Sequence, residues 1–205
     1  MATATRTRDD HRSDNRRNDD AGYFDRDNAA VLAIGAGAGL AIGLAANLFR
    51  KAVVQAPTIL AGEWDQALAA EHKLALGIFD KLQQTDETQT TKRSMLLMQL
   101  KHALTKHALQ EENTVYAAMR DAGLKVEADQ LNGEHGYVKQ YLYDLTIMPK
   151  DNPAWIAKVT EFRQAIEKHV QEEETQLFPQ LRRSLSEEQN RQLTVAMNKE
   201  GLKIA

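Results

Sequence analysis

The chain has no cysteine, few glycines and prolines, and no excess of charge of one sign. Without cysteine, a disulfide scaffold, a zinc finger and a thiolate-ligated cluster are excluded. The absence of cysteine is compatible with a reducing compartment. With 11 glycines and 4 prolines in 205 residues, the chain is neither collagen-like nor of low complexity. A net charge of −3 gives no electrostatic footprint for nucleic acid, so we expect no nucleic-acid partner.

Charged residues of both signs fill residues 1–28, which carry six arginines and seven aspartates and almost no large apolar side chain. Such a segment cannot bury enough surface to offset the entropy of the chain, so we expect a disordered charged leader. Its balanced charge is not that of a basic arm that binds nucleic acid.

An uncharged run of 21 residues follows at 29–49 and ends at Arg50 and Lys51. As a helix it is long enough to cross the hydrocarbon core of a bilayer, so we expect residues 29–51 to form an apolar, glycine-rich membrane helix. Gly35, Gly39 and Gly43 repeat the spacing that lets two membrane helices approach closely, which indicates a homo-oligomer through this helix.

Two other interpretations of the run stay open. It can be a glycine-rich helix that packs on a partner in water, or a signal peptide, although no clear cleavage site precedes the folded part. Basic residues flank the run on both sides, so the positive-inside bias is slight. We expect a membrane-associated protein with its folded part on the cytoplasmic side.

From residue 56 onward the pattern is that of amphipathic helices. Apolar residues at a spacing of three and four predict helices at 62–84, 89–121, 125–147 and 153–182, and a further helix after Ser186. The connections are short, so neighbouring helices run antiparallel. The expected fold is all-α: an up-down-up-down four-helix bundle at 56–182 with a short C-terminal helix at 183–205.

Each of the four predicted bundle helices has a stripe of residues, spaced three and four apart, that faces the core. Each of these core stripes contains one histidine, and two of these histidines are followed at i+4 by a glutamate on the same face. The six residues are His72, His107, Glu111, His135, His169 and Glu173. One histidine alone on an apolar face is usually a satisfied core residue, and a glutamate within an acidic run is often solvated. Six such groups on four core faces are hard to leave unpaired, because a buried carboxylate needs a partner or a metal.

The types of donor atom narrow the choice of metal. Imidazole with carboxylate suits iron, manganese or zinc, and four nitrogens with two anions can hold two divalent ions. The order His-x-x-x-Glu differs from the Glu-x-x-His of ferritin-like sites and argues against that class. His102 lies about 140° around the helix from His107, so we expect it on the surface. His11 lies in the leader and is not a candidate ligand.

Together these motifs resemble the hemerythrin-like, HHE cation-binding domain over residues 56–182. The parts that carry the resemblance are Glu71-His72, residues 107–112, Glu134-His135 and residues 169–174. The resemblance implies a diiron centre, with two iron ions expected ahead of zinc or manganese. It also implies that His72, His107, Glu111, His135, His169 and Glu173 are the ligands, with both glutamates bridging the metals.

Two departures from the oxygen-carrying hemerythrins bear on function. Lys139 stands where those proteins have a second histidine in the third helix. Their last carboxylate is an aspartate five residues after the histidine of the fourth helix, whereas Glu173 comes four residues after His169 and Glu174 stands at the fifth position. Reversible oxygen carriage is therefore in doubt. The expected function is to bind or sense O₂, nitric oxide, peroxide or iron, without being an enzyme. The alternatives are a diiron enzyme that reduces peroxide or nitric oxide, and a structural, oligomerising bundle without redox metal.

Overall fold

The computed structural model describes residues 46–47, 50–51 and 60–204. The predicted charged leader at 1–28 lies outside these residues, as do Gly35, Gly39 and Gly43 with nearly all of the apolar run. Among the described residues, no helix has both the length and the apolar character needed to cross a membrane.

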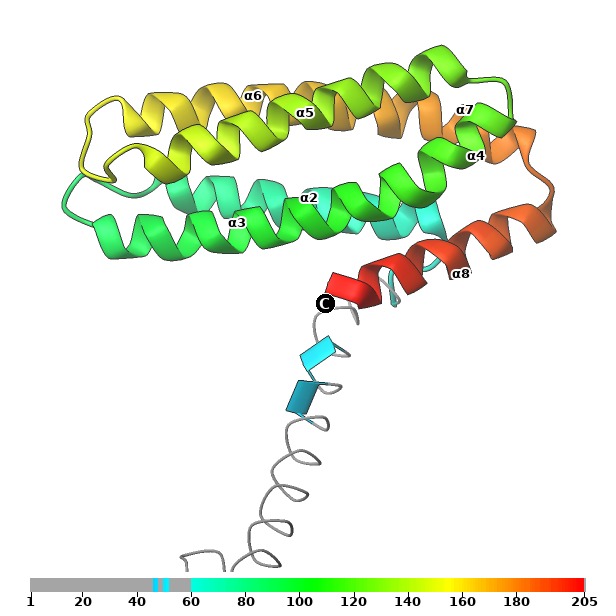
Figure 1. The fold of residues 1–205 in the computed structure, drawn as a ribbon, viewed down its shortest axis with the longest axis horizontal. Helices are drawn as coiled ribbons and strands as arrows, with labels where there is room; N and C mark the ends of the chain where they lie inside the picture. Colours follow the sequence, from blue (N-terminus) through cyan, green and yellow to red (C-terminus); the bar gives the residue numbers. More distant parts are fainter. Residues whose placement is uncertain (1–45, 48–49, 52–59, 205) are drawn as a thin grey trace, which may run out of the picture. The chain divides into compact units, whose positions relative to one another are not determined.

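Four long antiparallel helices form a bundle within residues 60–204 (Figure 1). They are α2 (Trp64–Gln83), α3 (Thr90–Gln110), α5 (Lys125–Ile147) and α6 (Trp155–Glu172). Helix α2 contacts α3 and α6, and α5 contacts the same two helices, so the order around the bundle is α2, α3, α5, α6. The predicted all-α bundle is confirmed, and each helix starts within two residues of its predicted start.

The second and fourth predicted helices are interrupted by one wide turn each. A π-helical turn, η1 (Glu111–Val115), separates α3 from α4 (Tyr116–Asp121). A matching turn, η2 (Glu173–Leu177), separates α6 from α7 (Phe178–Ser184). A π turn adds a residue to the helical turn and is found most often at functional sites. Here it places residues five apart on the same buried face.

Local sequence signals explain where two helices end and begin. Gly123 has φ of 86°, and the backbone N–H of Leu124 donates to the carbonyl of Met119, so the chain leaves the helix at Gly123 and α4 ends. At the next corner the Asn152 side chain accepts a hydrogen bond from the Ala154 N–H at 2.8 Å. This turn leads into α6, which begins at Trp155.

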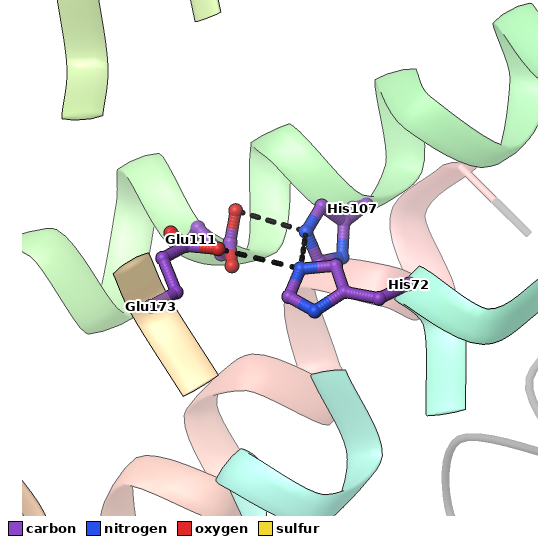
Figure 2. A group of neighbouring side chains, drawn as sticks. All are labelled: His72, His107, Glu111 and Glu173. Atoms are coloured by element: carbon purple, nitrogen blue, oxygen red, sulfur yellow. Dashed lines mark hydrogen bonds and ion pairs between the residues drawn. The ribbon is translucent and has the colours of Figure 1, made fainter. Parts of the chain in front are cut away.

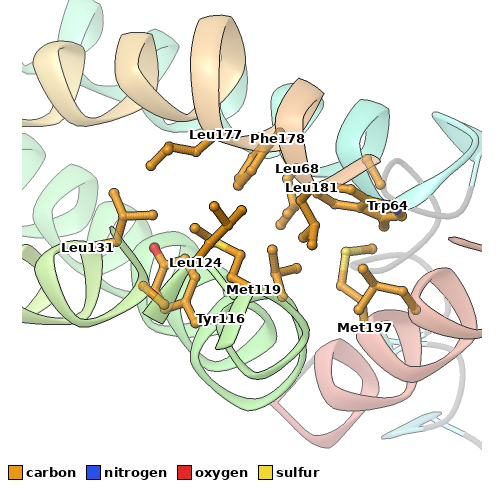
Figure 3. Packing of buried hydrophobic residues seen from close by; sticks show 14 residues of the cluster. Trp64, Leu68, Tyr116, Met119, Leu124, Leu131, Leu177, Phe178, Leu181 and Met197 are labelled. Atoms are coloured by element: carbon orange, nitrogen blue, oxygen red, sulfur yellow. The ribbon is translucent and has the colours of Figure 1, made fainter. Parts of the chain in front are cut away.

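Two apolar clusters lie at the two ends of the bundle, separated by the layer that contains the buried histidines. Trp64, Tyr116, Phe178 and Met197 belong to the cluster drawn in Figure 3. The cluster at the other end includes Phe79, Phe162, Leu100, Leu145 and Trp155. The rings of Trp64 and Phe178 meet edge to face at 5.3 Å, and those of Phe79 and Phe162 at 5.1 Å. The polar layer is therefore enclosed on both sides by packed core.

The C-terminal helix α8 (Glu187–Ile204) has 18 residues and is longer than the short helix predicted. It turns back from α7 and contacts α2, α3 and η1 (Figure 1). Leu193 and Met197 enter the first apolar cluster, and Asn190 accepts a hydrogen bond from the indole N–H of Trp64 at 2.9 Å. The helix thus covers the end of the bundle nearest Trp64.

Candidate metal centre

Four histidine side chains meet inside the bundle, one from each long helix. The Nε2 atoms of His72 on α2 and His107 on α3 lie 2.9 Å apart (Figure 2). The ring centroids of His135 on α5 and His169 on α6 lie 5.1 Å apart. All four side chains are buried, as expected for positions on the core stripes. Two facing imidazole nitrogens at such a distance require a proton or a cation between them.

Two fully buried carboxylates lie among these rings. Glu111 Oε2 is 3.1 Å from His107 Nε2 and 3.3 Å from His135 Nε2. Glu173 Oε2 is 3.3 Å from Nε2 of both His72 and His169. Each glutamate is the first residue of a π turn and connects two helices through its histidine contacts.

The geometry divides into two overlapping groups of donor atoms. His72, His107, Glu111 and Glu173 offer atoms that lie within 4.8 Å of one another, and so do Glu111, His135 and His169. In the described part of the chain, Glu111 Oε1, Glu173 Oε2 and His169 Nε2 make no well-directed hydrogen bond, although Glu173 Oε2 lies within ion-pair distance of His72 and His169. Buried acceptors without a donor are rare and costly, and a cation would satisfy them. The residues therefore fit a metal ion.

Protons stabilise this cluster in the metal-free chain. Burial acts to raise the pKa of Glu111, but the charges and hydrogen bonds of His107 and His135 hold it well below its usual range. Burial acts to lower the pKa of His135, but hydrogen bonds with Glu111 and Glu112 raise it to about 9. Burial also opposes the charge on His107, and Glu111 and Glu71 nevertheless raise its pKa well above the usual value. Metal binding must therefore displace protons from these histidines.

The outward-facing Nδ1 atom of each histidine contacts a further carboxylate that sequence analysis assigned no role. The pairs are His72 with Glu174 (2.8 Å), His107 with Glu71 (3.2 Å), His135 with Glu112 (3.0 Å) and His169 with Glu134 (2.7 Å). The signal for them was present in the sequence, because each of these glutamates directly adjoins one of the six predicted ligands.

The centre is built from two similar halves. Glu71-His72 is followed by His107-x-x-x-Glu-Glu, and Glu134-His135 is followed by a second copy that begins at His169. In both halves the π turn begins at the first glutamate of the pair and is followed by an aromatic residue, Tyr116 or Phe178. The two helix pairs thus contribute matching groups to one site.

Comparison with known proteins identifies the family that shares this pattern. The profile of the hemerythrin HHE cation-binding domain matches residues 65–181, more than half of the chain. The chain belongs to the hemerythrin HHE cation-binding family. The family description names cation binding, and the histidine and glutamate cluster of this chain is compatible with binding a metal.

The chain is also similar to part of a longer bacterial protein. A protein named DNA nickase from Nostoc sp. (strain PCC 7120) is 28% identical over 122 residues. The alignment covers 60% of this chain and 34% of that protein, so the chain spans about a third of the length of the relative. No solved structure matches the chain.

The hydroxyl of Tyr116 makes the two halves of the HHE site unequal. It donates to Glu173 Oε1 at 2.8 Å and lies 3.3 Å from Glu111 Oε2 and 3.2 Å from His135 Nε2. Burial and the charges of Glu111 and Glu173 raise the pKa of Tyr116 well above its usual value, so the phenol keeps its proton. Phe178, the matching residue of the second half, has no hydroxyl.

Tyr116→Phe is expected to lower the free energy of unfolding of the metal-free protein by about 2 kcal/mol, because it removes a buried hydrogen bond to a carboxylate. Tyr141→Phe is the matched control. The Tyr141 hydroxyl donates to Glu161 at 2.9 Å on the surface, where water replaces the lost donor, so the expected cost is below about 1 kcal/mol. Urea unfolding of both variants measures the difference, and equal costs would contradict a role for Tyr116 in the site.

A cavity of about 20 Å³ adjoins the four histidines. Beyond the histidines it is lined by Glu71 and otherwise by apolar side chains, among them Leu104, Val138 and Ile166. Leu104 and Ile166 also belong to the apolar cluster around Phe79, in which Phe162 is fully buried. A space of this size holds one molecule as small as water or a diatomic gas.

The structure also places the residues on which the HHE sequence departs from the oxygen carriers. Lys139 is exposed, and its Nζ pairs with Glu112 Oε1 at 3.1 Å instead of entering the donor cluster. Glu174, one residue after Glu173, contacts the outer nitrogen of His72. His102 lies on the surface, as predicted, and His11 lies outside the described residues.

Proposed function

We propose that this chain is a non-haem diiron protein that binds or senses O₂, nitric oxide, peroxide or iron itself. The observation that carries the proposal is the pair of donor groups that share Glu111, because two overlapping groups suit two ions bridged by a carboxylate. The set of four imidazoles and two carboxylates, without a thiolate, favours iron, with manganese or zinc as weaker candidates. His72, His107, Glu111 and Glu173 would hold one ion, and His135 and His169 would complete the other.

The surroundings of the cluster support a small ligand. Iron held by these residues would supply an open coordination position for a diatomic molecule or peroxide. The cavity beside the histidines is of that size, and most of its lining beyond the histidines is apolar. The Tyr116 hydroxyl holds the Glu173 carboxylate in place.

The iron content of the purified full chain tests the proposal. We expect about two irons per chain by elemental analysis, and an optical spectrum that changes when O₂, nitric oxide or peroxide is added to the reduced protein. Turnover of peroxide or nitric oxide with an electron donor would instead support the enzymatic alternative. A chain that takes up at most one ion of any metal, or none, would refute the diiron centre.

We further propose that residues 29–51 tether the protein to a membrane, with the bundle on the cytoplasmic side. The support is the uncharged run of 21 residues at 29–49. Membranes that contain the full chain should retain it through a carbonate wash, whereas a chain that begins at residue 52 should be released. Release of the full chain would refute the tether.

Self-association through the glycines of this run is a separate proposal. Gly39→Leu would fill the groove that Gly35, Gly39 and Gly43 leave on one helix face, while making the run more apolar. The variant should therefore stay in the carbonate-washed membrane and show less cross-linking between copies. Undiminished cross-linking would contradict packing through these glycines.

We propose no nucleic-acid partner for this chain, in contrast to the activity that the name of its Nostoc relative implies for that protein. The net charge of −3 supports this view, as does the short part of the relative that the chain matches. Nicking of supercoiled plasmid by the iron-loaded chain would overturn it.

A further inference from the structure

The outer carboxylates of the site are arranged in a closed circle around the bundle. Glu71 on α2 contacts His107 on α3, and Glu112, just after α3, contacts His135 on α5. Glu134 on α5 contacts His169 on α6. Glu174, just after α6, contacts His72 on α2 and closes the circle. Each helix thus supplies a histidine to the centre and a carboxylate to the histidine of the next helix.

The positions of these carboxylates follow from the antiparallel arrangement. On α2 and α5, the carboxylate comes one residue before the helix's own histidine, as in Glu71-His72 and Glu134-His135. On the two helices of opposite direction, it comes five residues after the histidine, inside the π turn. The same spacing therefore occurs twice, once in each half of the bundle, which a chance set of surface glutamates would not produce.

We propose that Glu71, Glu112, Glu134 and Glu174 form a ring of positioning carboxylates that orients the four metal-binding histidines and sets both the metal affinity and the reduction potential of the centre. The inference rests on the proposed diiron function. None of the four ring residues belongs to the two donor groups, so they act through the histidines.

The physical basis is the hydrogen bond from each Nδ1–H. A carboxylate acceptor at Nδ1 keeps the proton on that nitrogen and leaves the Nε2 lone pair facing the centre. The negative charge also makes the imidazole a stronger donor, which favours ferric over ferrous iron. Two lysines partly neutralise the negative charge of the ring: Lys106 pairs with Glu71 at 2.7 Å, and Lys139 pairs with Glu112 at 3.1 Å.

Glu134 is the best position for a test. Its contact with His169 is the shortest of the four, at 2.7 Å, and its side chain is 28% exposed, so truncation leaves no cavity in the core. Glu134→Gln keeps an oxygen that can accept the Nδ1 hydrogen bond but removes the charge. Glu134→Ala removes both. Glu161→Gln is the matched control, because the Glu161 carboxylate also accepts a hydrogen bond, from Tyr141, on the exposed face of α6.

Both metal affinity and reduction potential are measured on the full chain. Competition with chelators gives the affinities for zinc and for ferrous iron. Glu134→Ala should bind either metal 10- to 100-fold more weakly than the parent. Glu134→Gln should bind ferrous iron within a few fold of the parent. Its preference for ferric over ferrous iron should fall about tenfold, which raises the potential by about 59 mV for one electron. Glu161→Gln should change neither quantity.

Failure of the ring proposal can be distinguished from failure of the diiron proposal. If both Glu134 variants match Glu161→Gln in affinity and potential, the ring has no positioning role and the inference is wrong. If the parent binds zinc but not two irons, the diiron function fails, and the zinc affinity of Glu134→Ala still decides the ring. Should Glu134→Ala fail to fold, Glu174→Ala replaces it, because that side chain is 38% exposed and its loss should weaken zinc binding in the same way.

Discussion

Replacing His107 with alanine is expected to remove at least half of the bound metal, whereas replacing His102 on the same helix is expected to remove none. His107 Nε2 lies 2.9 Å from His72 Nε2 and 3.1 Å from Glu111 Oε2, so its loss breaks one donor group and frees the carboxylate shared with the other. His102 is exposed and touches none of these atoms. Elemental analysis of the purified variants gives the metal per chain.

His169→Ala provides the symmetric test of the same assignment. It removes the matching histidine from the second half and should also abolish or halve the metal content. Far-UV circular dichroism of each variant distinguishes loss of metal from loss of fold. If His102→Ala strips the metal as thoroughly as His107→Ala, the assignment of helix faces is wrong.

The sequence predicts the bundle well because its helices are long and their apolar residues strictly periodic. The residues spaced three or four apart on one face of the first predicted helix are all buried, namely Trp64, Leu68, His72, Ala75, Phe79 and Leu82. The helix ends were also encoded, by Gly123 at the end of α4 and by Asn152 before α6. Periodicity places His72 and His107 on inward faces without any knowledge of how the helices pack.

What the sequence did not predict depends on contacts between helices. The 3.6-residue repeat of apolar residues does not predict where a π turn interrupts a helix. Residues 111–115 and 173–177 were therefore expected to continue as regular α-helix. The hydroxyl of Tyr116 reaches the site only because the π turn brings residue 116 onto the face of Glu111. The ring carboxylates are partly exposed, and such residues usually belong to the solvated face of a helix.

The structure also changes the expected energetics of the metal-free state. From the sequence alone, Glu111 and Glu173 would be buried without partners once the metal is removed. Instead, each lies within 3.3 Å of two histidine nitrogens that can carry protons. Protons therefore replace part of the charge of the metal, and the metal-free chain can keep its fold at neutral pH.

This substitution of protons for metal predicts a dependence on pH. In the metal-free fold the pKa of His135 is about 9, above its ordinary value of 6.5. A histidine with a raised pKa contributes stability that is fully present below pH 6.5 and is lost as the pH rises through about 9. If the four histidines bind the metal, they do so as neutral ligands, and this loss is then absent from the metal-loaded protein.

Removing the metal should therefore lower the melting temperature by about 10 °C near pH 7, and by more at higher pH. Free metal at a thousandfold excess over its dissociation constant stabilises the fold by about 4 kcal/mol, and each kcal/mol shifts the melting temperature of a chain of this size by about 2–4 °C. Calorimetry of metal-saturated and chelator-treated protein at pH 6.5, 7.5 and 8.5 measures both effects. A metal-free protein whose melting temperature stays level or rises over this range would show that its buried carboxylates are not held by protonated histidines, and equal melting curves for the two forms would place the metal outside the core.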